Sequence, residues 1–391
     1  MFRRASVLLT LLVACVLVSE PLASSFRTAT RPSLTTLELT INGDDFRVNG
    51  ATDFLVFISY MDGLDQGGSN RTTDFNYISG KGIEGIRVFA NWWEYNMDGD
   101  DRPDGIASAD NDGLCESNGT LRASTLTTLE GLLDDAKAYG LIVDLTFAAE
   151  IESGLTLAEY EDCLQNITQH LENGGADYEH VFFDIQNEYN LNGPNNADPL
   201  SDGQVAALVT AIKAIDPTRI VTASISSVVS NLTTVKNKTA AAGVDVLGYH
   251  HDRTKGYYDL SGGWTNTLDG SSKPVYMQEP ERRRTDTNSI HGEPEDWLTK
   301  ERLATDLYNV YSNGGAAWTF HNGGSFLLGH DILQGQLDPT EELFLTCLDQ
   351  GDPFSNTCSP GPVPDMESPN LLFALLNWLA PNYAPRVGGT R

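Results

Sequence analysis

The chain has 391 residues, of which 40% are hydrophobic and 20% are charged, and its formal net charge is −29. Binding to nucleic acid or to an anionic membrane needs an extended basic surface that displaces counterions, and the one arginine cluster of this chain, at residues 282–284, is too short for that. Both kinds of partner are therefore disfavoured. The length fits one large α/β barrel or two ordinary domains.

Residues 1–25 have the pattern of a secretory signal peptide. Two arginines precede an apolar stretch from Val7 to Val18, and small residues follow it. The stretch is too short for a membrane span, and no other segment approaches the ~20 apolar residues that a span requires. We therefore expect a secreted protein without a membrane span. A lipid anchor at Cys15, which ends the segment LVAC, is the alternative.

A β-hairpin pattern comes first in the mature chain. It covers residues 37–50, and its turn falls at Asn42 and Gly43. We expect this hairpin to cover the floor of the fold that follows.

Eight short runs rich in Val, Ile and Phe come next, and most are separated by stretches with apolar residues at three- and four-residue spacing. The runs are residues 53–60, 82–90, 140–148, 180–188, 219–226, 245–251, 273–279 and 315–322. Two helix-like stretches, 125–140 and 201–217, end at Gly140 and Pro217. These alternations predict a (β/α)8 TIM barrel, as a single domain over residues 26–391. A doubly wound open sheet competes, but it does not explain where the polar residues fall.

Two long loops follow the second and eighth runs, at about residues 94–124 and 323–368. Loops on the carboxyl side of barrel strands build active sites, so we expect these two to wall a cleft. The acidic run at 98–104 lacks the ligand spacing of a calcium loop, and we expect it to be solvated. An apolar helix at 370–381 is expected to close the chain.

Four cysteines lie outside the signal region: Cys115, Cys163, Cys347 and Cys358. An even number in an exported chain suggests two disulfides, with three possible connectivities. We favour Cys347 with Cys358, because this pair closes a short loop. Free thiols are the weaker alternative, and a zinc site is weaker still, since no CxxC or paired-histidine spacing is present.

Two glutamates close apolar runs, Glu188 in the fourth and Glu279 in the seventh. A carboxylate at the end of an apolar strand is costly to bury, so it needs a partner, a metal or a role in chemistry. Cleavage of a glycosidic bond uses two such groups. Other polar and aromatic residues gather at the same ends of the runs: Arg87, Asn91, Trp92, Asn187, Tyr249, His250 and Trp318.

At these positions the chain resembles the glycoside hydrolases of clan A, the retaining barrel enzymes that include cellulases and mannanases. The resemblance extends from the first run to the eighth, and its strongest element is the pair Asn187-Glu188. It implies that Glu188 is the acid/base, that Asn187 binds the sugar 2-hydroxyl and that Glu279 is the nucleophile. Glu281 has the same strand parity as Glu279, but Pro280 is expected to leave it in the loop.

The resemblance extends to the residues around the two glutamates. It implies that Arg87 keeps the nucleophile ionised and that Trp318 forms an aromatic floor under the sugar. His250 is the counterpart of a strand-six histidine, although the run Tyr249-His250-His251 departs from the family's His-x-Tyr pattern. From the residues alone, core packing stays open for Trp318, and Trp92 is equally able to support a loop.

Together these features predict a retaining glycoside hydrolase that cleaves β-linked oligo- or polysaccharides as a monomer, with no cofactor and no metal. A glycan-binding protein with weak or no catalysis is an alternative from another class. A transglycosidase would share every residue named and differ only in what accepts the intermediate.

Overall fold

A computed structural model of the chain describes residues 36–90, 113–147, 155–191, 199–226, 232–250, 272–280, 300–322, 332–337 and 339–349. The predicted signal peptide, the acidic run at 98–104 and the closing helix at 370–381 lie outside these ranges, as does most of both long loops.

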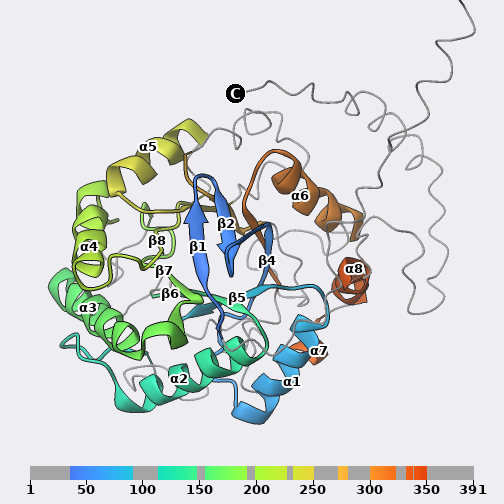
Figure 1. The fold of residues 1–391 in the computed structure, drawn as a ribbon, viewed down its shortest axis with the longest axis horizontal. Helices are drawn as coiled ribbons and strands as arrows, with labels where there is room; N and C mark the ends of the chain where they lie inside the picture. Colours follow the sequence, from blue (N-terminus) through green and yellow to red (C-terminus); the bar gives the residue numbers. More distant parts are fainter. Residues whose placement is uncertain are drawn as a thin grey trace, which may run out of the picture.

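Eight parallel strands form the centre of the molecule (Figure 1). They are β4 (Leu55–Ser59), β5 (Gly85–Phe89), β6 (Ile142–Thr146), β7 (Val181–Asp184), β8 (Val221–Thr222), β9 (Leu247–His250), β10 (Val275–Glu279) and β11 (Ala317–Phe320). Their order in the sheet is β8-β7-β6-β5-β4-β11-β10-β9, and a parallel bridge between Ile225 and Tyr249 joins its two ends. The backbone N–H of His250 donates to the Ile225 carbonyl at 2.9 Å across this junction. The sheet therefore closes, and the predicted (β/α)8 barrel is confirmed.

Helices surround the barrel (Figure 1). They are α1 (Gly68–Ser79), α2 (Ala123–Ala138), α3 (Leu157–Gly174), α4 (Asp202–Ile215), α5 (Leu232–Ala242), α6 (Lys300–Ser312), α7 (Leu333–Gln336) and α8 (Pro339–Asp349), with a 3-10 turn at Gly175–Tyr178. The helices predicted at 125–140 and 201–217 are α2 and α4. A capping box between Ser201 and Gln204 begins α4, and Gly140, with a φ of 72°, follows α2. Within the described residues, no helix has both the length and the apolar character of a membrane span.

The predicted hairpin is also confirmed, and a third strand extends it. Strand β1 (Leu39–Asn42) pairs antiparallel with β2 (Asp45–Val48), which pairs with β3 (Ala51–Asp53). Phe46 of β2 is fully buried, with its ring 6.0 Å from that of Phe182 in β7. The hairpin thus covers the floor of the barrel.

Alternation along the strands separates two apolar layers. Val56 and Ile58 of β4 belong to the large cluster between the strands and the helices, whereas Leu55 and Phe57 belong to the floor cluster. In the neighbouring strand, a β-carbon on Gly85 would lie 2.3 Å from the Phe57 ring. The absence of a side chain at Gly85 is therefore what makes room for Phe57 in the barrel interior.

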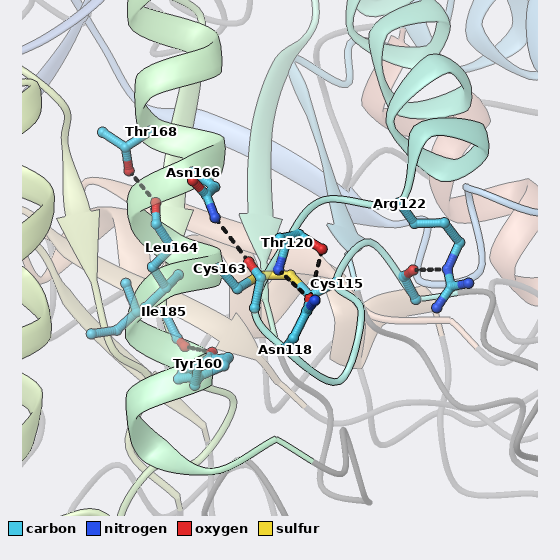
Figure 2. Close-up of a disulfide and its surroundings, with 12 residues drawn as sticks. Cys115, Asn118, Thr120, Arg122, Tyr160, Cys163, Leu164, Asn166, Thr168 and Ile185 are labelled. Carbon is cyan, nitrogen blue, oxygen red and sulfur yellow. Dashed lines mark hydrogen bonds between the residues drawn. A yellow bond between two sulfur atoms is a disulfide. The ribbon is translucent and has the colours of Figure 1, made fainter.

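A disulfide joins Cys115 to Cys163 of α3, with 5.9 Å between their α-carbons (Figure 2). The side chain of Asn166 on the same helix donates to the Gly119 carbonyl at 3.0 Å. These contacts fix the described end of the long loop after β5 onto α3. Cys347 is also disulfide-bonded, while Cys358, its favoured partner, lies outside the described residues.

Candidate active site

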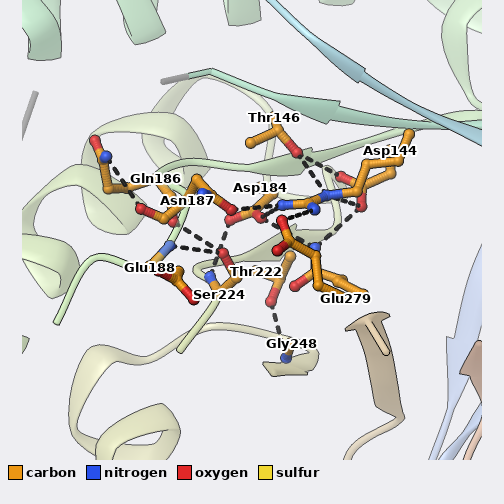
Figure 3. Close-up of polar contacts among 12 residues, drawn as sticks. Asp144, Thr146, Asp184, Gln186, Asn187, Glu188, Thr222, Ser224, Gly248 and Glu279 are labelled. Carbon is orange, nitrogen blue, oxygen red and sulfur yellow. Dashed lines mark hydrogen bonds and ion pairs between the residues drawn. The ribbon is translucent and has the colours of Figure 1, made fainter. Parts of the chain in front are cut away.

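The two glutamates singled out in the sequence meet inside the carboxyl end of the barrel. Glu188 follows β7 and Glu279 ends β10, and Figure 3 shows both side chains in one polar cluster. The Nδ1 atom of His250 lies 2.8 Å from Glu188 Oε1 and 3.4 Å from Glu279 Oε2. One atom from each of these three side chains lies within 4.8 Å of the other two. Both glutamate side chains are largely buried, with 12% and 10% of their surface exposed.

A β-bulge brings Glu279 into the cluster. Met277 pairs with Tyr249 and Glu279 pairs with His250, so Gln278 is an extra residue in β10. Because of this shift, two consecutive side chains reach the barrel interior. Gln278 Nε2 donates to Asp184, and Glu279 Oε1 accepts from Arg87. The competing Glu281 lies outside the described residues.

An unusual backbone conformation directs Glu188. Its φ is +49°, in the left-handed region that few residues other than glycine adopt. Such a conformation costs on the order of 1 kcal/mol or more, so the surroundings must hold it in place. The Glu188 N–H donates to Ser224 Oγ at 3.0 Å, and that hydroxyl donates to the Gln186 carbonyl at 3.2 Å. This local bracing fixes the direction in which the Glu188 carboxylate points.

Arg87 links Glu279 to the residue before Glu188. Its guanidinium is fully buried, donating from Nη1 to Glu279 Oε1 at 2.6 Å and from Nη2 to Asn187 Oδ1 at 2.8 Å. Burial disfavours the charge, but Glu279, Asp144 and Asp184 outweigh it and raise the pKa of Arg87. Arg87 is therefore a permanent cation next to Glu279, in the place that the sequence predicted.

Three residues that the sequence interpretation missed complete the cluster: Asp144, Asp184 and Gln278 (Figure 3 labels both aspartates). Arg87 lies 3.5 Å from Asp144 and 3.4 Å from Asp184, and Gln278 Nε2 donates to both aspartates at 3.0 Å. Both aspartates are fully buried. The signal was present in the sequence, because each aspartate interrupts an apolar run on the side of the strand that faces Arg87.

Two predicted substrate contacts are not brought to this cluster. Trp318 is fully buried, its indole N–H donates to Asp306 of α6, and its ring packs against Phe320 and Phe344. The prediction that Trp318 forms the floor under the sugar is therefore wrong, because its parity in β11 turns it towards the helices. Tyr249 is likewise in the strand–helix layer, with 1% of its surface exposed.

The interior position at the end of β11 is held by His321 instead. Its Nδ1 lies 2.7 Å from Ser59 Oγ at the end of β4, and both side chains are buried. This pair lines the same carboxyl end of the barrel, and the sequence interpretation did not single it out. Asn91 and Trp92 lie outside the described residues, so their predicted role stays a prediction.

The spacing of Glu188, His250 and Glu279 would also suit a divalent cation, since each offers one ligand atom within reach of the others. However, Glu279 is paired with Arg87, and His250 Nδ1 is hydrogen-bonded to Glu188. We therefore assign these atoms to one another and not to a metal.

Comparison with known proteins finds similar barrels among solved structures. An endo-1,4-β-mannanase from Rhizomucor miehei has 13% identity and a TM-score of 0.51, with coverage of 72% of this chain and 90% of the other. A family 5 glycoside hydrolase from Bacteroides vulgatus has 13% identity and a TM-score of 0.54, with coverage of 80% and 70%. A family 5 mannosidase from R. miehei has 12% identity and a TM-score of 0.51, with coverage of 74% and 86%.

By sequence, no family model and no curated protein matches. At these identities the structural likeness establishes the architecture of the chain. The protein has the (β/α)8-barrel fold that these glycoside hydrolases share.

Proposed function

We propose that the protein is a retaining glycoside hydrolase that cleaves β-linked oligo- or polysaccharides. The observation that carries this proposal is the approach of Glu188 and Glu279, whose nearest oxygens lie within 4.8 Å. Retaining enzymes place their two carboxyl groups about 5–5.5 Å apart, whereas inverting enzymes leave about 6.5–9.5 Å for a water molecule. The shorter separation supports a covalent intermediate.

In the proposed first step, Glu279 attacks the anomeric carbon while Glu188 protonates the leaving glycosidic oxygen. The C–O bond to the leaving group breaks, and a glycosyl ester of Glu279 forms. Arg87 lies 2.6 Å from Glu279, and a neighbouring cation favours the charged carboxylate that this attack requires. The negative charge of Glu279 in turn favours retention of the proton on Glu188.

In the second step, Glu188 is already a carboxylate, because its proton left with the leaving group, and the ester has removed the negative charge of Glu279 that opposed this ionisation. Glu188 then accepts a proton from water. The resulting hydroxide attacks the anomeric carbon and regenerates Glu279, with net retention of configuration. His250, hydrogen-bonded to Glu188, orients this carboxylate between its two tasks. Asn187, held by Arg87, is positioned next to Glu188 to contact the sugar 2-hydroxyl.

The structural neighbours suggest where to look for the substrate. Two of them carry the names of a mannanase and a mannosidase, so β-mannans are the first polymers to test, followed by cellulose and other β-glycans. We also propose that the protein is exported by its N-terminal signal. The disulfide between Cys115 and Cys163 supports this proposal, because such bonds persist in oxidising compartments.

The proposed function is tested by trapping with 2-deoxy-2-fluoro glycosides that have an activated leaving group, in the β-manno and β-gluco series. Peptide mass spectrometry should find one added fluoroglycosyl group on the peptide that contains Glu279. Glu279→Gln should take up no label. Glu342→Gln on α8, whose carboxylate accepts from Tyr77 outside the barrel, is the matched control and should label normally. If no fluorosugar labels the protein and no polysaccharide is hydrolysed, the proposal fails.

A further inference from the structure

The buried cluster around Arg87 contains more acidic than basic side chains. Arg87 is one guanidinium, and it lies within 3.5 Å of three carboxyl groups: Asp144, Asp184 and Glu279. Arg87 and the two aspartates have no exposed surface. Several unpaired charges in such an interior are costly, so one carboxyl group of the three is expected to hold a proton.

The contacts of each carboxyl group indicate which one holds that proton. Glu279 has the shortest contact with Arg87, at 2.6 Å. Asp184 accepts from two N–H donors, the backbone of Ser224 and the side chain of Gln278, both at 3.0 Å. Asp144 has the longest contact with Arg87, at 3.5 Å.

The other neighbours of Asp144 can pair with a neutral acid as well as with a carboxylate. Thr146 Oγ1 lies 3.4 Å from Asp144 Oδ1, and the hydroxyl of Tyr276 also reaches the carboxyl group. These hydroxyls can accept or donate, so they tolerate a protonated oxygen. Burial and the negative charge of Asp184 raise the pKa of Asp144 to about 7, although Arg87, Gln278 and Tyr276 oppose the shift. Burial also raises the pKa of Tyr276, which keeps its hydroxyl neutral.

We propose that Asp144 is a positioning residue for the nucleophile: while Asp144 is protonated, Arg87 stays directed at Glu279, and loss of this buried proton weakens that pairing. An ionised Asp144 would attract the Nε side of Arg87, away from the Nη1 contact with Glu279. It would also repel the carboxylate of Asp184, which accepts from the same Gln278 Nε2 atom. The groups that face Asp144 are Arg87 from β5, Asp184 from β7, and Tyr276 and Gln278 from β10.

This inference rests on the proposed glycosidase activity for its kinetic consequence, but its protonation step can be tested without substrate. Glu188, the proposed acid, also holds a proton, so the infrared spectra are recorded in the Glu188→Gln background. At pH 6 they should contain the C=O band of a neutral carboxylic acid, which disappears by pH 9. Glu188→Gln/Asp144→Asn should lack that band at both pH values. A wild-type protein without a neutral-acid band at pH 6 would overturn the inference, even if every variant failed to fold.

The kinetic test uses a 2,4-dinitrophenyl β-glycoside, whose leaving group departs without a proton from Glu188. The pH dependence of kcat/KM then reports the nucleophile and its neighbours. Wild-type kcat/KM should fall above about pH 7, whereas Asp144→Asn, which mimics the protonated form, should not show that fall. The ratio of variant to wild-type kcat/KM should rise by about tenfold or more from pH 6 to pH 9, as expected when one inhibitory ionisation is removed.

The matched control is Asp135→Asn. Asp135 is also paired with an arginine, at 2.7 Å from Arg71, but this pair joins α1 and α2 outside the barrel. It should leave the pH profile of kcat/KM unchanged. If Asp144→Asn lowers kcat equally at every pH, Asp144 is merely structural and the inference fails. If the wild-type protein has no glycosidase activity, the proposed function is refuted instead. The infrared result would still decide whether Asp144 holds the proton.

Discussion

The two ends of the barrel interior differ sharply, although the same strands build both. In β7, Phe182 packs in the floor under the hairpin, and two residues later Asp184 faces Arg87. In β6, Ile142 likewise packs in the floor, and two residues later Asp144 faces Arg87. Two residues along a strand span only about 7 Å. The interior therefore passes from an apolar floor to a charged cluster within one step of the side-chain alternation.

This difference separates stability from chemistry. The floor gains free energy as apolar surface is removed from water, at roughly 25 cal/mol per Å². At the charged end, removing Arg87 and its carboxyl partners from water costs free energy, and a buried ion pair of this kind often gives no net stabilisation. Substitutions at the floor should therefore change stability and leave turnover intact, and substitutions at the charged end should do the reverse.

The largest expected effect comes from Glu279→Gln at the charged end. Removing the proposed covalent nucleophile should lower kcat on the order of 10⁶-fold, while glycan binding remains. The melting temperature should change little, because glutamine keeps the shape and can still accept from Arg87. Activity assays and calorimetry on the same preparation measure both quantities. A variant that unfolds as it loses activity would contradict the separation of the two ends.

Glu188→Ala should have the next largest effect, and the effect should depend on the substrate. Loss of general acid catalysis should lower kcat/KM by roughly 10²–10⁴-fold for substrates with poor leaving groups. Aryl glycosides with excellent leaving groups need no proton, so their first step should be much less affected. Parallel assays with dinitrophenyl glycosides and a natural polymer check this. Equal impairment on both kinds of substrate would be incompatible with the acid/base assignment.

The contrast between the two ends also explains which features could be predicted from the sequence. Apolar alternation is a periodic signal, so all eight strands, the hairpin and helices such as α2 and α4 were predicted correctly. The approach of Glu188 and Glu279 followed from the barrel, since the carboxyl ends of parallel strands meet at one edge. Local irregularities carry no such period.

Three site features depended on such irregularities or on side-chain direction. The bulge at Gln278 turns Glu279 inwards, and the positive φ of Glu188 directs its carboxylate; neither has a sequence signature in this chain. The prediction for Trp318 is wrong for a different reason, because it follows the family resemblance and not the alternation of side chains along β11. Counting alternate residues forward from Ala317, which belongs to the floor cluster, places Thr319 inside the barrel and Trp318 outside it.

At the floor, Phe46→Ala should cost about 3–5 kcal/mol in the free energy of unfolding, as large-to-small changes of buried aromatics do. Phe46 is fully buried and packs on Phe182 beneath the barrel. Urea unfolding measures the loss, and Phe46→Leu, which keeps more of the volume, should cost less. Below the melting temperature the folded variant should keep its kcat within about twofold, since the floor contributes nothing to chemistry. A large fall in kcat for folded protein would show that the two ends are coupled.

The smallest expected effect concerns the pH dependence of stability at the amino end. His180, just before β7, is fully buried with Nε2 3.1 Å from the Leu133 carbonyl, and burial lowers its pKa from 6.5 to about 4. Between these values the unfolded chain binds more protons than the folded one, so stability is complete above pH 6.5 and falls as the pH drops towards 4. The loss should be on the order of 3 kcal/mol at most. Urea unfolding from pH 4 to 7 should show this slope in the wild type and lose it in His180→Gln, while substitution of the half-exposed His170 on α3 leaves it in place.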